Sequence, residues 1–159
     1  PLVVEDAAGL FTAHSDPAVH HFWSCQAHAS LEESATYTAD TIAVPHSLHW
    51  ALTEDGGEAL GRLSLFRPRH GVGEIGVIIR AAAQGKGLTS ECLRFVCNFG
   101  FETLGLMRIC ADVDPDNVAS LRLFERNGFQ REGVLRNNWT THIGVRDSII
   151  LARLPRDPA

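Results

Sequence analysis

The sequence has no cluster of basic residues. Its 159 residues include 14 lysines and arginines against 19 aspartates and glutamates, which gives a formal net charge of -5. Binding to nucleic acid through the phosphates requires grouped cations, so this balance argues against nucleic acid as the main partner. The same balance is compatible with a cationic amine as the substrate.

Long apolar runs and paired cysteines are also missing. We expect no signal peptide and no membrane span, because no apolar stretch is long enough for one. Cysteines occur at four positions without any Cys-x-x-Cys spacing, and none lies beside a histidine in an evident nucleophile motif: Cys25, Cys92, Cys97 and Cys110. These absences predict a reduced, cytoplasmic protein and argue against a covalent route through cysteine.

The eight histidines follow no familiar metal-binding pattern. The sequence contains no His-Glu-x-x-His motif. The adjacent pair His20 and His21 would point in different directions on either a helix or a strand. We therefore expect no metal site.

Length and composition predict one domain that covers residues 1–159. Apolar residues make up 45% of the chain and charged residues 21%, which is enough to bury one core. There are no internal repeats, low-complexity tracts or linkers.

What the sequence does contain is a glycine-rich turn between an apolar strand and a helix. The strand runs to about Arg80, the turn is Gln84-Gly-Lys-Gly87, and an amphipathic helix is predicted from Leu88. Glycines permit a sharp bend and close approach of a ligand, and the first turn of a helix offers partly positive N–H groups. The spacing matches neither a Walker loop nor Gly-x-Gly-x-x-Gly. The turn therefore predicts a pyrophosphate site, with an ordinary turn as the alternative.

A second motif makes the prediction specific. Asp114-Pro-Asp-Asn117 begins a short helix, with Asp114 or Asp116 as the expected cap, and Gly128 ends it. With the glycine-rich turn before it, this order of motifs resembles the GNAT superfamily of acetyl-coenzyme A-dependent N-acetyltransferases. The segments Glu74-Ile-Gly, Asn117-x-x-Ser120, Asn127-Gly-Phe129 and Glu132-Gly-Val-Leu-Arg136 are similar to the RimJ/RimL-type branch, named for acetylation of ribosomal-protein N-termini. The resemblance covers nearly the whole chain.

The spacing of apolar residues predicts the order of helices and strands. Helices are expected within residues 3–14, 30–43 and 88–104 and after Asn117, and strands within residues 46–53, 58–66, 72–80, 107–113, 129–139 and 145–154. The resemblance implies an α+β GNAT fold, in which helices flank a mixed, mostly antiparallel central sheet and the cofactor lies between two splayed central strands. It also implies that the first strand of such a domain is missing or truncated.

The resemblance further implies acetyl-coenzyme A (acetyl-CoA) as the cofactor and indicates the residues that bind it. Backbone groups of Val77, Ile78 and Ile79 would pair with the pantetheine arm. The pyrophosphate would bind to amides of the glycine-rich turn and the first helical turn, namely Gln84, Gly85, Lys86, Gly87, Leu88 and Thr89. Thr89 stands where the family pattern has glycine or alanine. Asn117 and Ser120 lie three residues apart, so on a helix they face the same stretch of cofactor.

Two residues are candidates for catalysis. Glu74 matches a glutamate that serves as general base in several GNAT branches, with a solvent-exposed carboxylate at a strand end as the alternative. Ser120 would donate a proton to the departing thiolate, because the usual tyrosine four residues later is Phe124 here; the alternative is a small polar residue without a catalytic role. The catalytic glutamate of RimL-like enzymes is replaced by Trp139.

The prediction is an N-acetyltransferase that moves an acetyl group from acetyl-CoA to a primary amine by direct attack, with a protein or peptide N-terminal α-amine as acceptor. Two alternatives remain open: an enzyme for a polyamine, amino acid or aminoglycoside, and a non-catalytic acyl-CoA-binding module. Both a monomer and a homodimer are compatible with the sequence. Asp147 is expected to be structural or to orient the substrate, and the candidates for the acceptor pocket are Trp23, His49, Trp50, Asn137, Asn138, Trp139 and His142.

Overall fold

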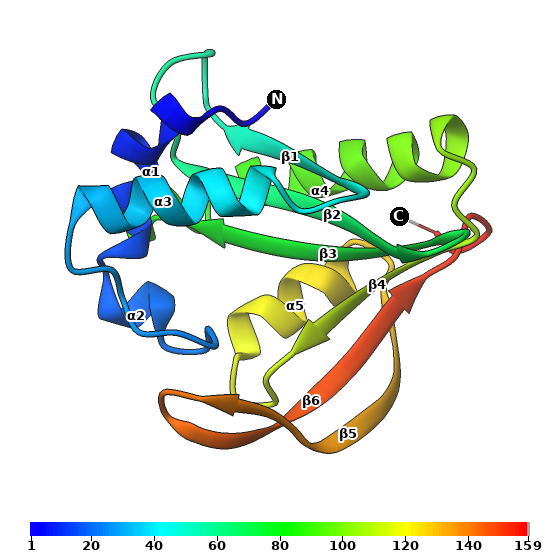
Figure 1. The fold of residues 1–159 in the computed structure, drawn as a ribbon. Coiled ribbons are helices and arrows are strands. Elements are labelled where there is room, and N and C mark those ends of the chain that lie inside the picture. Colours follow the sequence, from blue (N-terminus) through cyan, green and yellow to red (C-terminus); the bar gives the residue numbers. More distant parts are fainter. Residues whose placement is uncertain (159) are drawn as a thin grey trace.

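The computed structural model describes residues 1–158, except for the side chain at position 68. The chain forms one six-stranded sheet with the order β1-β2-β3-β4-β6-β5 (Figure 1). Its strands are β1 (Ser47–Leu52), β2 (Gly61–Arg69), β3 (Val72–Ile79), β4 (Arg108–Val113), β5 (Gln130–Thr141) and β6 (Gly144–Arg153). Neighbours are antiparallel, except that β3 and β4 run parallel. The six predicted strands and the α+β class are confirmed.

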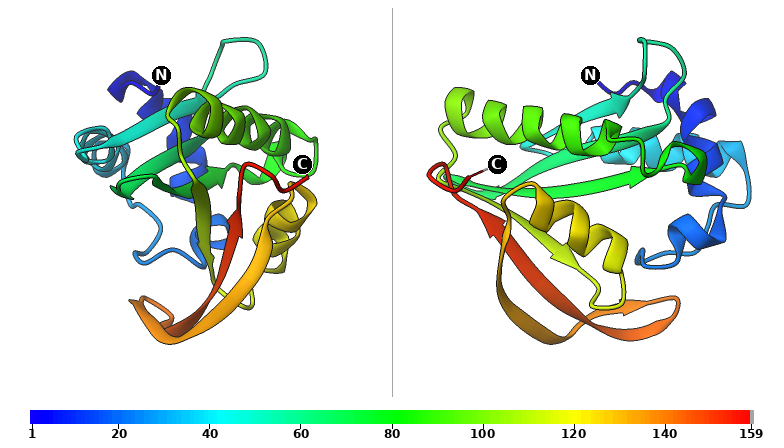
Figure 2. Two further views of the ribbon diagram at one scale, coloured as in Figure 1. Left: turned by 90° about the vertical axis from the view of Figure 1, so that its right-hand side faces the viewer. Right: turned by 180° about the vertical axis from the view of Figure 1, so that it is seen from behind.

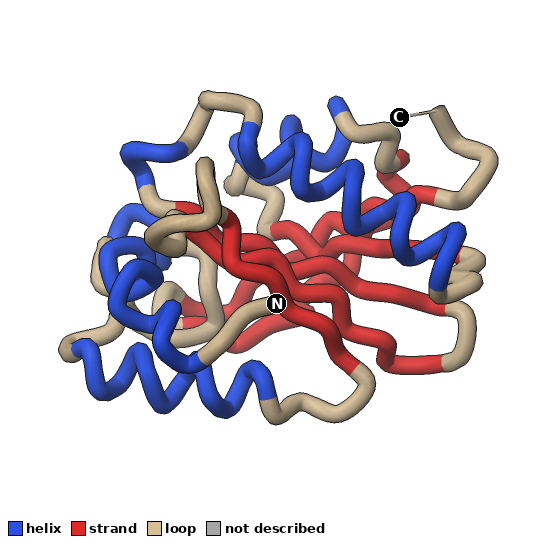
Figure 3. Tube along the Cα trace, turned by 90° about the horizontal axis from the view of Figure 1, so that it is seen from above, coloured by secondary structure: helices blue, strands red, loops and turns tan. Residues whose placement is uncertain are grey.

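Helices cover both faces of this sheet (Figures 2 and 3). The α-helices are α1 (Ala7–His14), α2 (Pro17–His20), α3 (Leu31–Ile42), α4 (Leu88–Asn98) and α5 (Val118–Arg126); shorter helical turns are η1 (Val4–Asp6), η2 (Ala81–Ala83) and η3 (Phe99–Thr103). In Figure 2, α1 and α3 lie on one face, and α4 and α5 lie on the other. Among residues 1–158, none of the helices is both long enough and apolar enough to cross a bilayer.

The ends of α3 and α5 follow from local hydrogen bonds. The Ser30 hydroxyl accepts the N–H of Glu33 at 3.2 Å at the start of α3, which lies within the helix expected at residues 30–43. The expected cap of α5 was wrong, because Asn117 begins this helix and its Oδ1 accepts the N–H of Ser120 at 3.1 Å. Asp114 instead accepts the N–H of Asp116 within the preceding turn and forms an ion pair with Arg146.

The core lies between the sheet and the helices α4 and α5. Leu63, Leu65, Leu93, Ile109 and Leu151 are completely buried there. Burial of each such side chain stabilises the fold by roughly 1.5–3 kcal/mol. The core therefore fixes the paired ends of β3 and β4, from which the two strands diverge.

The central strands separate at Glu74. Val72–Glu74 of β3 pairs with Arg108–Cys110 of β4. Beyond this point β3 follows β2 and β4 follows β6, each in an antiparallel ladder, and the twist of a sheet carries such strands apart. The edge of β3 that faces β4 therefore has no strand partner from Ile75 onward within residues 1–158. Figure 1 shows the resulting wedge, which opens toward α2 and α5.

Candidate active site

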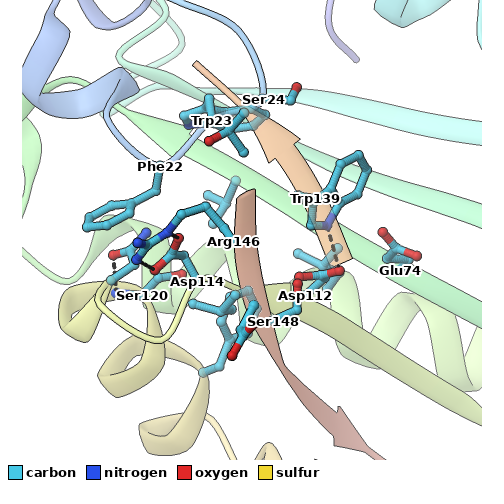
Figure 4. A pocket seen from close by; sticks show the side chains of 18 of the residues that line it. Phe22, Trp23, Ser24, Glu74, Asp112, Asp114, Ser120, Trp139, Arg146 and Ser148 are labelled. Atoms are coloured by element: carbon cyan, nitrogen blue, oxygen red, sulfur yellow. Dashed lines mark hydrogen bonds and ion pairs between the residues drawn. The ribbon is translucent and has the colours of Figure 1, made fainter. Parts of the chain in front are cut away.

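A cavity of about 420 Å³ occupies the wedge between β3 and β4 (Figure 4). Its walls come from the loop after α2, from β3 and β4, from α5 and from the hairpin of β5 and β6. Glu74 and Ser120, the two predicted catalytic residues, both line it, as do Val77 and Asn117. The fold thus brings together lining residues that run from Phe22 to Ser148 in the sequence.

Glu74 lies in the cavity wall and not at an exposed strand end. It is half-buried and is the last residue of β3 that pairs with β4. Burial raises the pKa of Glu74, and the nearby Asp112 carboxylate raises it further. A carboxylate whose pKa is moved toward neutral is a stronger base than an ordinary glutamate. The position and environment of Glu74 therefore suit proton abstraction.

Asp112 faces Glu74 from β4 and was not identified from the sequence. Its Oδ2 accepts the indole N–H of Trp139 at 2.9 Å (Figure 4). The same oxygen accepts the side-chain N–H of Asn138 at 2.8 Å. Trp139 is thereby fixed over the cavity. The signal was present in the alternation of β4, because Ile109, Ala111 and Val113 are buried and Asp112 must face the opposite way.

Arg146 connects β6 to the loop before α5. Its Nε and Nη2 donate to the two carboxylate oxygens of Asp114 at 2.7 and 2.9 Å, and Nη2 also bonds Asp116. The guanidinium lowers the pKa of Asp114, so this carboxylate stays ionised and neutralised by its partner. Among residues 1–158, the other carboxylates of the cavity wall form no ion pair with an arginine, namely Glu74, Asp112 and Asp147. No sequence motif pointed to Arg146, because its partners lie 30 and 32 residues away.

On α5, Ser120 is the hydroxyl residue that lines the cavity. It is half-buried, and the Asn117 cap accepts its backbone N–H, so the Ser120 hydroxyl is not used in capping. Phe124 follows one turn later, is 2% exposed, and packs edge-on against Phe129 at 5.0 Å between ring centroids. Position 124 therefore offers no proton donor, as the sequence indicated.

The glycine-rich turn has the geometry of an anion cradle. Gly85 and Gly87 have φ angles of 75° and 90°, which L side chains rarely adopt, and open space surrounds the place where each Cβ would be. Gly87 begins α4, and within residues 1–158 no side chain caps that helix end. The side chain of Gln84 donates to the Ile79 carbonyl at 3.2 Å and so ties the turn to the end of β3. The first-turn amides of α4, at Leu88 and Thr89, are thus available to a pyrophosphate; Lys86 is exposed beside them.

The end of β3 fits an extended ligand through its backbone. The side chains of Ile78 and Ile79 are 4% and 9% exposed, so they belong to the packed interior, whereas Val77 reaches the cavity. The backbone edge that faces β4 has no strand partner within residues 1–158. An extended chain that pairs there would run from the glycine-rich turn toward Glu74, as a pantetheine arm requires.

The remaining predicted pocket residues divide into two groups. Of the predicted acceptor-pocket residues, Trp23 and Trp139 line the cavity, whereas Asn137, Asn138 and His142 do not. Asp147, which was expected to be structural or to orient the substrate, also lines it. Asp147 accepts the backbone N–H of Asn137 at 2.8 Å. Nδ1 of His142 donates to the Trp23 carbonyl at 3.1 Å, which joins the β5–β6 hairpin to the loop after α2.

His49 and Trp50 do not belong to the cavity. Both lie on β1, at the edge of the sheet farthest from β4 and β6. His49 is buried between the hydroxyls of Ser47 and Ser64, and Trp50 packs edge-on against Phe99. Both are therefore packing residues, and their assignment to the acceptor pocket was wrong. Residue type alone does not reveal how far a strand lies from the wedge.

Comparison with known proteins gives consistent results. The model of a family described as "Acetyltransferase (GNAT) domain" matches residues 1–130. The uncharacterized N-acetyltransferase YoaA of Bacillus subtilis (strain 168) is 32% identical over 138 residues, which are 83% of this chain and 78% of that protein. Spermidine N(1)-acetyltransferase of Escherichia coli (strain K12) is 26% identical over 152 residues, 94% of this chain and 81% of that protein.

Solved structures show the same architecture. A probable acetyltransferase (GNAT family) from Chromobacterium violaceum ATCC 12472 superposes with a TM-score of 0.89 at 28% identity, over 97% of this chain and 80% of that one. Spermidine N-acetyltransferase from Vibrio cholerae, solved in complex with CoA and spermine, shares the fold with a TM-score of 0.81 at 20% identity, over 96% of this chain and 92% of that one.

Proposed function

Because this chain belongs to the GNAT family of acetyl-CoA-dependent N-acetyltransferases, we propose that it acetylates a primary amine by direct attack in a ternary complex, with Glu74 as general base and Ser120 as proton donor. The observation that carries the proposal is the half-buried Glu74 carboxylate at the point where β3 and β4 separate. In that position the Glu74 carboxylate can reach an amine that enters from the wide end of the wedge.

Different residues of the chain bind the pyrophosphate, the pantetheine arm and the thioester of acetyl-CoA. Acetyl-CoA supplies the thioester carbonyl that the amine attacks. Backbone amides of Gln84–Thr89 bind the pyrophosphate, and Asn117 and Ser120 face the donor from α5. Backbone groups of Val77–Ile79 pair with the pantetheine arm, and an amide of β3 polarises the carbonyl.

The proton balance gives Glu74 and Ser120 distinct tasks. The amine must lose a proton to attack, and the raised pKa of Glu74 suits it to accept that proton directly or through water. The thiolate that departs must gain a proton, and the Ser120 hydroxyl lies in the cavity wall to donate one. Asp112 adds a second negative charge that attracts the cationic form of the amine into the wedge.

The preferred acceptor is a protein or peptide N-terminal α-amine, as in the RimJ/RimL-type branch. An α-amine with a pKa near ~8 is about one-tenth neutral at pH 7, whereas a lysine-like amine near ~10.4 is almost fully protonated. An α-amine therefore depends less on proton removal by Glu74, whose pKa is raised in the cavity. Phe22, Trp23 and Trp139 give the cavity an aromatic border that suits the side chains behind such an amine.

A polyamine is the second candidate. The similarity to spermidine N(1)-acetyltransferase of Escherichia coli extends over 94% of the chain. Glu74, Asp112 and Asp147 also place three carboxylates around the same cavity, which suits a substrate with more than one positive charge.

An acceptor panel distinguishes these candidates. The protein is incubated with acetyl-CoA and peptides that carry a free N-terminus, the same peptides with a blocked N-terminus and an internal lysine, spermidine, and an aminoglycoside. Thiol release and product mass are measured together. Acetylation of the free α-amine alone supports the preferred acceptor, and acetylation of spermidine alone replaces it with the second. Silence across the panel despite acetyl-CoA binding contradicts the proposal.

Ser120→Ala is expected to lower kcat by about 10- to 100-fold while the KM for acetyl-CoA changes little, since only protonation of the thiolate is impaired. The double variant Ser120→Ala/Phe124→Tyr places a phenol one turn away on the same helix face and is expected to recover part of kcat. Steady-state kinetics with both substrates test this. A wild-type kcat in Ser120→Ala would remove Ser120 from the mechanism.

A further inference from the structure

Three buried histidines and a cysteine meet beside the loop that borders the catalytic cavity. His14, His20 and His28 are 0%, 1% and 5% exposed, and their ring centroids are 4.7 to 5.9 Å apart. The ligand atoms of His20, Cys25 and His28 all lie within 4.8 Å of one another. The sequence predicted that His20 and His21 diverge, and His21 is indeed exposed, but His20 turns inward to residues that its sequence neighbours did not reveal.

The hydrogen bonds of this cluster leave one side of the rings unused. Nδ1 of His14 and Nδ1 of His28 lie 2.6 and 3.0 Å from the Ser34 hydroxyl, and Nδ1 of His20 lies 3.4 Å from the Cys25 carbonyl. The Nε2 atoms of His14 and His20 are buried without a hydrogen-bond partner among residues 1–158. Buried polar atoms in proteins are nearly always paired, so two such atoms in one cluster indicate a missing ligand.

We propose that His20, Cys25 and His28 bind a divalent transition-metal ion, with Zn²⁺ as the expected ion. Imidazole nitrogen and thiolate sulfur are the ligands that Zn²⁺ prefers. Tetrahedral Zn²⁺ places such atoms about 3.3–3.6 Å apart, so the cluster needs only a small contraction. The fourth position is left to water. The spacing Cys25-x-x-His28 is the sequence signal for this site.

The charges around the cluster are compatible with this ion. Glu33 accepts the backbone N–H of Ala29 at 2.7 Å and so places a negative charge next to His28. Binding breaks the S–H bond of Cys25, forms a metal–thiolate bond and releases one proton to solvent.

The ion would fix one wall of the catalytic cavity. Phe22, Trp23 and Ser24 line that cavity and lie within the loop between His20 and Cys25. With both ends of this short loop held by the ion, its three cavity residues are restrained as well, and the hydrogen bond from His142 to the Trp23 carbonyl links them to β5 and β6. This consequence for the acceptor rests on the proposed function, whereas metal binding itself does not.

Metal binding is tested on the full chain after treatment with a chelator. Titration with Co²⁺ is expected to give thiolate-to-cobalt charge-transfer and tetrahedral d–d absorption bands that saturate at one equivalent, and Zn²⁺ is expected to displace Co²⁺ and raise Tm. Cys25→Ser and His28→Gln should lose the bands. The matched controls Cys92→Ser and His21→Gln should keep them. Failure of the unmutated protein to bind one equivalent, or bands that persist in Cys25→Ser, would overturn the site regardless of how the variants fold.

The effect on the acceptor is measured separately. Removal of the metal is expected to raise the KM for the amine several-fold and to leave the KM for acetyl-CoA unchanged, because only the acceptor wall is released. An unchanged KM for the amine would overturn the link to catalysis. A protein that binds Co²⁺ but acetylates no amine would contradict the proposed function and leave the metal site supported.

Discussion

Glu74→Gln is expected to lower kcat/KM for amine acetylation by about 10²- to 10⁴-fold at pH 7, the range for loss of a positioned general base. Glutamine has nearly the same shape but cannot accept the proton of the amine. Its neighbours are retained, since Asp112 is held by Trp139 and Asn138 and not by Glu74. Initial rates at varied amine and saturating acetyl-CoA measure the effect.

Glu102→Gln is the matched control. Glu102 is an exposed glutamate in η3, which follows the end of α4 opposite to the glycine-rich turn. Its replacement is expected to leave the kinetics unchanged. If Glu74→Gln retained wild-type turnover, Glu74 would not be the base, and catalysis would rest on proximity of the substrates alone.

The raised pKa of Glu74 leads us to expect opposite effects of pH on activity and on stability. Burial and Asp112 raise the pKa of Glu74 in the folded protein above its ordinary value of 4.5. Between the ordinary pKa and the raised pKa of the folded protein, the folded chain binds more protons than the unfolded chain. The free energy of unfolding therefore falls as pH rises through this window. Activity rises over the same window because the carboxylate becomes a base.

Two measurements follow from this sign. The acid limb of the kcat/KM profile is expected above the pH of an ordinary glutamate, and Glu74→Gln should abolish it. At pH 7, Glu74→Gln should also have a Tm equal to or higher than that of the wild type, because it removes a desolvated charge. A lower Tm with an unchanged acid limb would contradict both the shifted pKa and the assigned role.

Gly87→Val is expected to raise the KM for acetyl-CoA by about 10- to 100-fold, with kcat at saturation little changed. Gly87 has a φ of 90°, which valine cannot adopt without strain, so the turn must move and carry its amides with it. Each lost hydrogen bond to a charged phosphate costs about 1.5–3 kcal/mol, and every 1.4 kcal/mol is about a tenfold change in affinity. Calorimetric titration with coenzyme A measures the loss directly.

Gly56→Val separates this effect from backbone strain. Gly56 has a φ of 81° in the loop between β1 and β2 and, like Gly87, has open space where a Cβ would be. Its replacement is expected to lower Tm by an amount similar to Gly87→Val without affecting acetyl-CoA binding. An equal KM in the two glycine variants would show that the turn before α4 does not bind the pyrophosphate.

Local patterns predicted much of this molecule. The alternation and spacing of apolar residues located six strands and the main helices, because each element reports its own periodicity. Gly85 and Gly87 were identified because a left-handed backbone is a local requirement. Asn117 and Ser120 were predicted to share one face of α5 from their spacing alone, and both line the cavity. The exception was the cap of α5. Asn117 caps this helix, whereas Asp114 forms an ion pair with Arg146, which is distant in the sequence.

Pairings between distant segments were not predictable in this way. Asp112 became part of the cavity because β4 diverges from β3, and Arg146 because β6 lies beside β4. His49 and Trp50 were excluded by the position of β1 at the sheet edge. His20 and His28 come together because the loop after α2 folds back over α1 and α3, which no periodicity records.

Short motifs indicated the family and the acetyl donor and located the glycine-rich turn before α4, since the geometry of such motifs is set by neighbouring residues. Which charges share the cavity between β3 and β4, and which histidines meet a cysteine, was settled by the tertiary structure. Those arrangements depend on sheet order and loop packing, and the burial that shifts the pKa of Glu74 exists only once distant elements exclude water from around it.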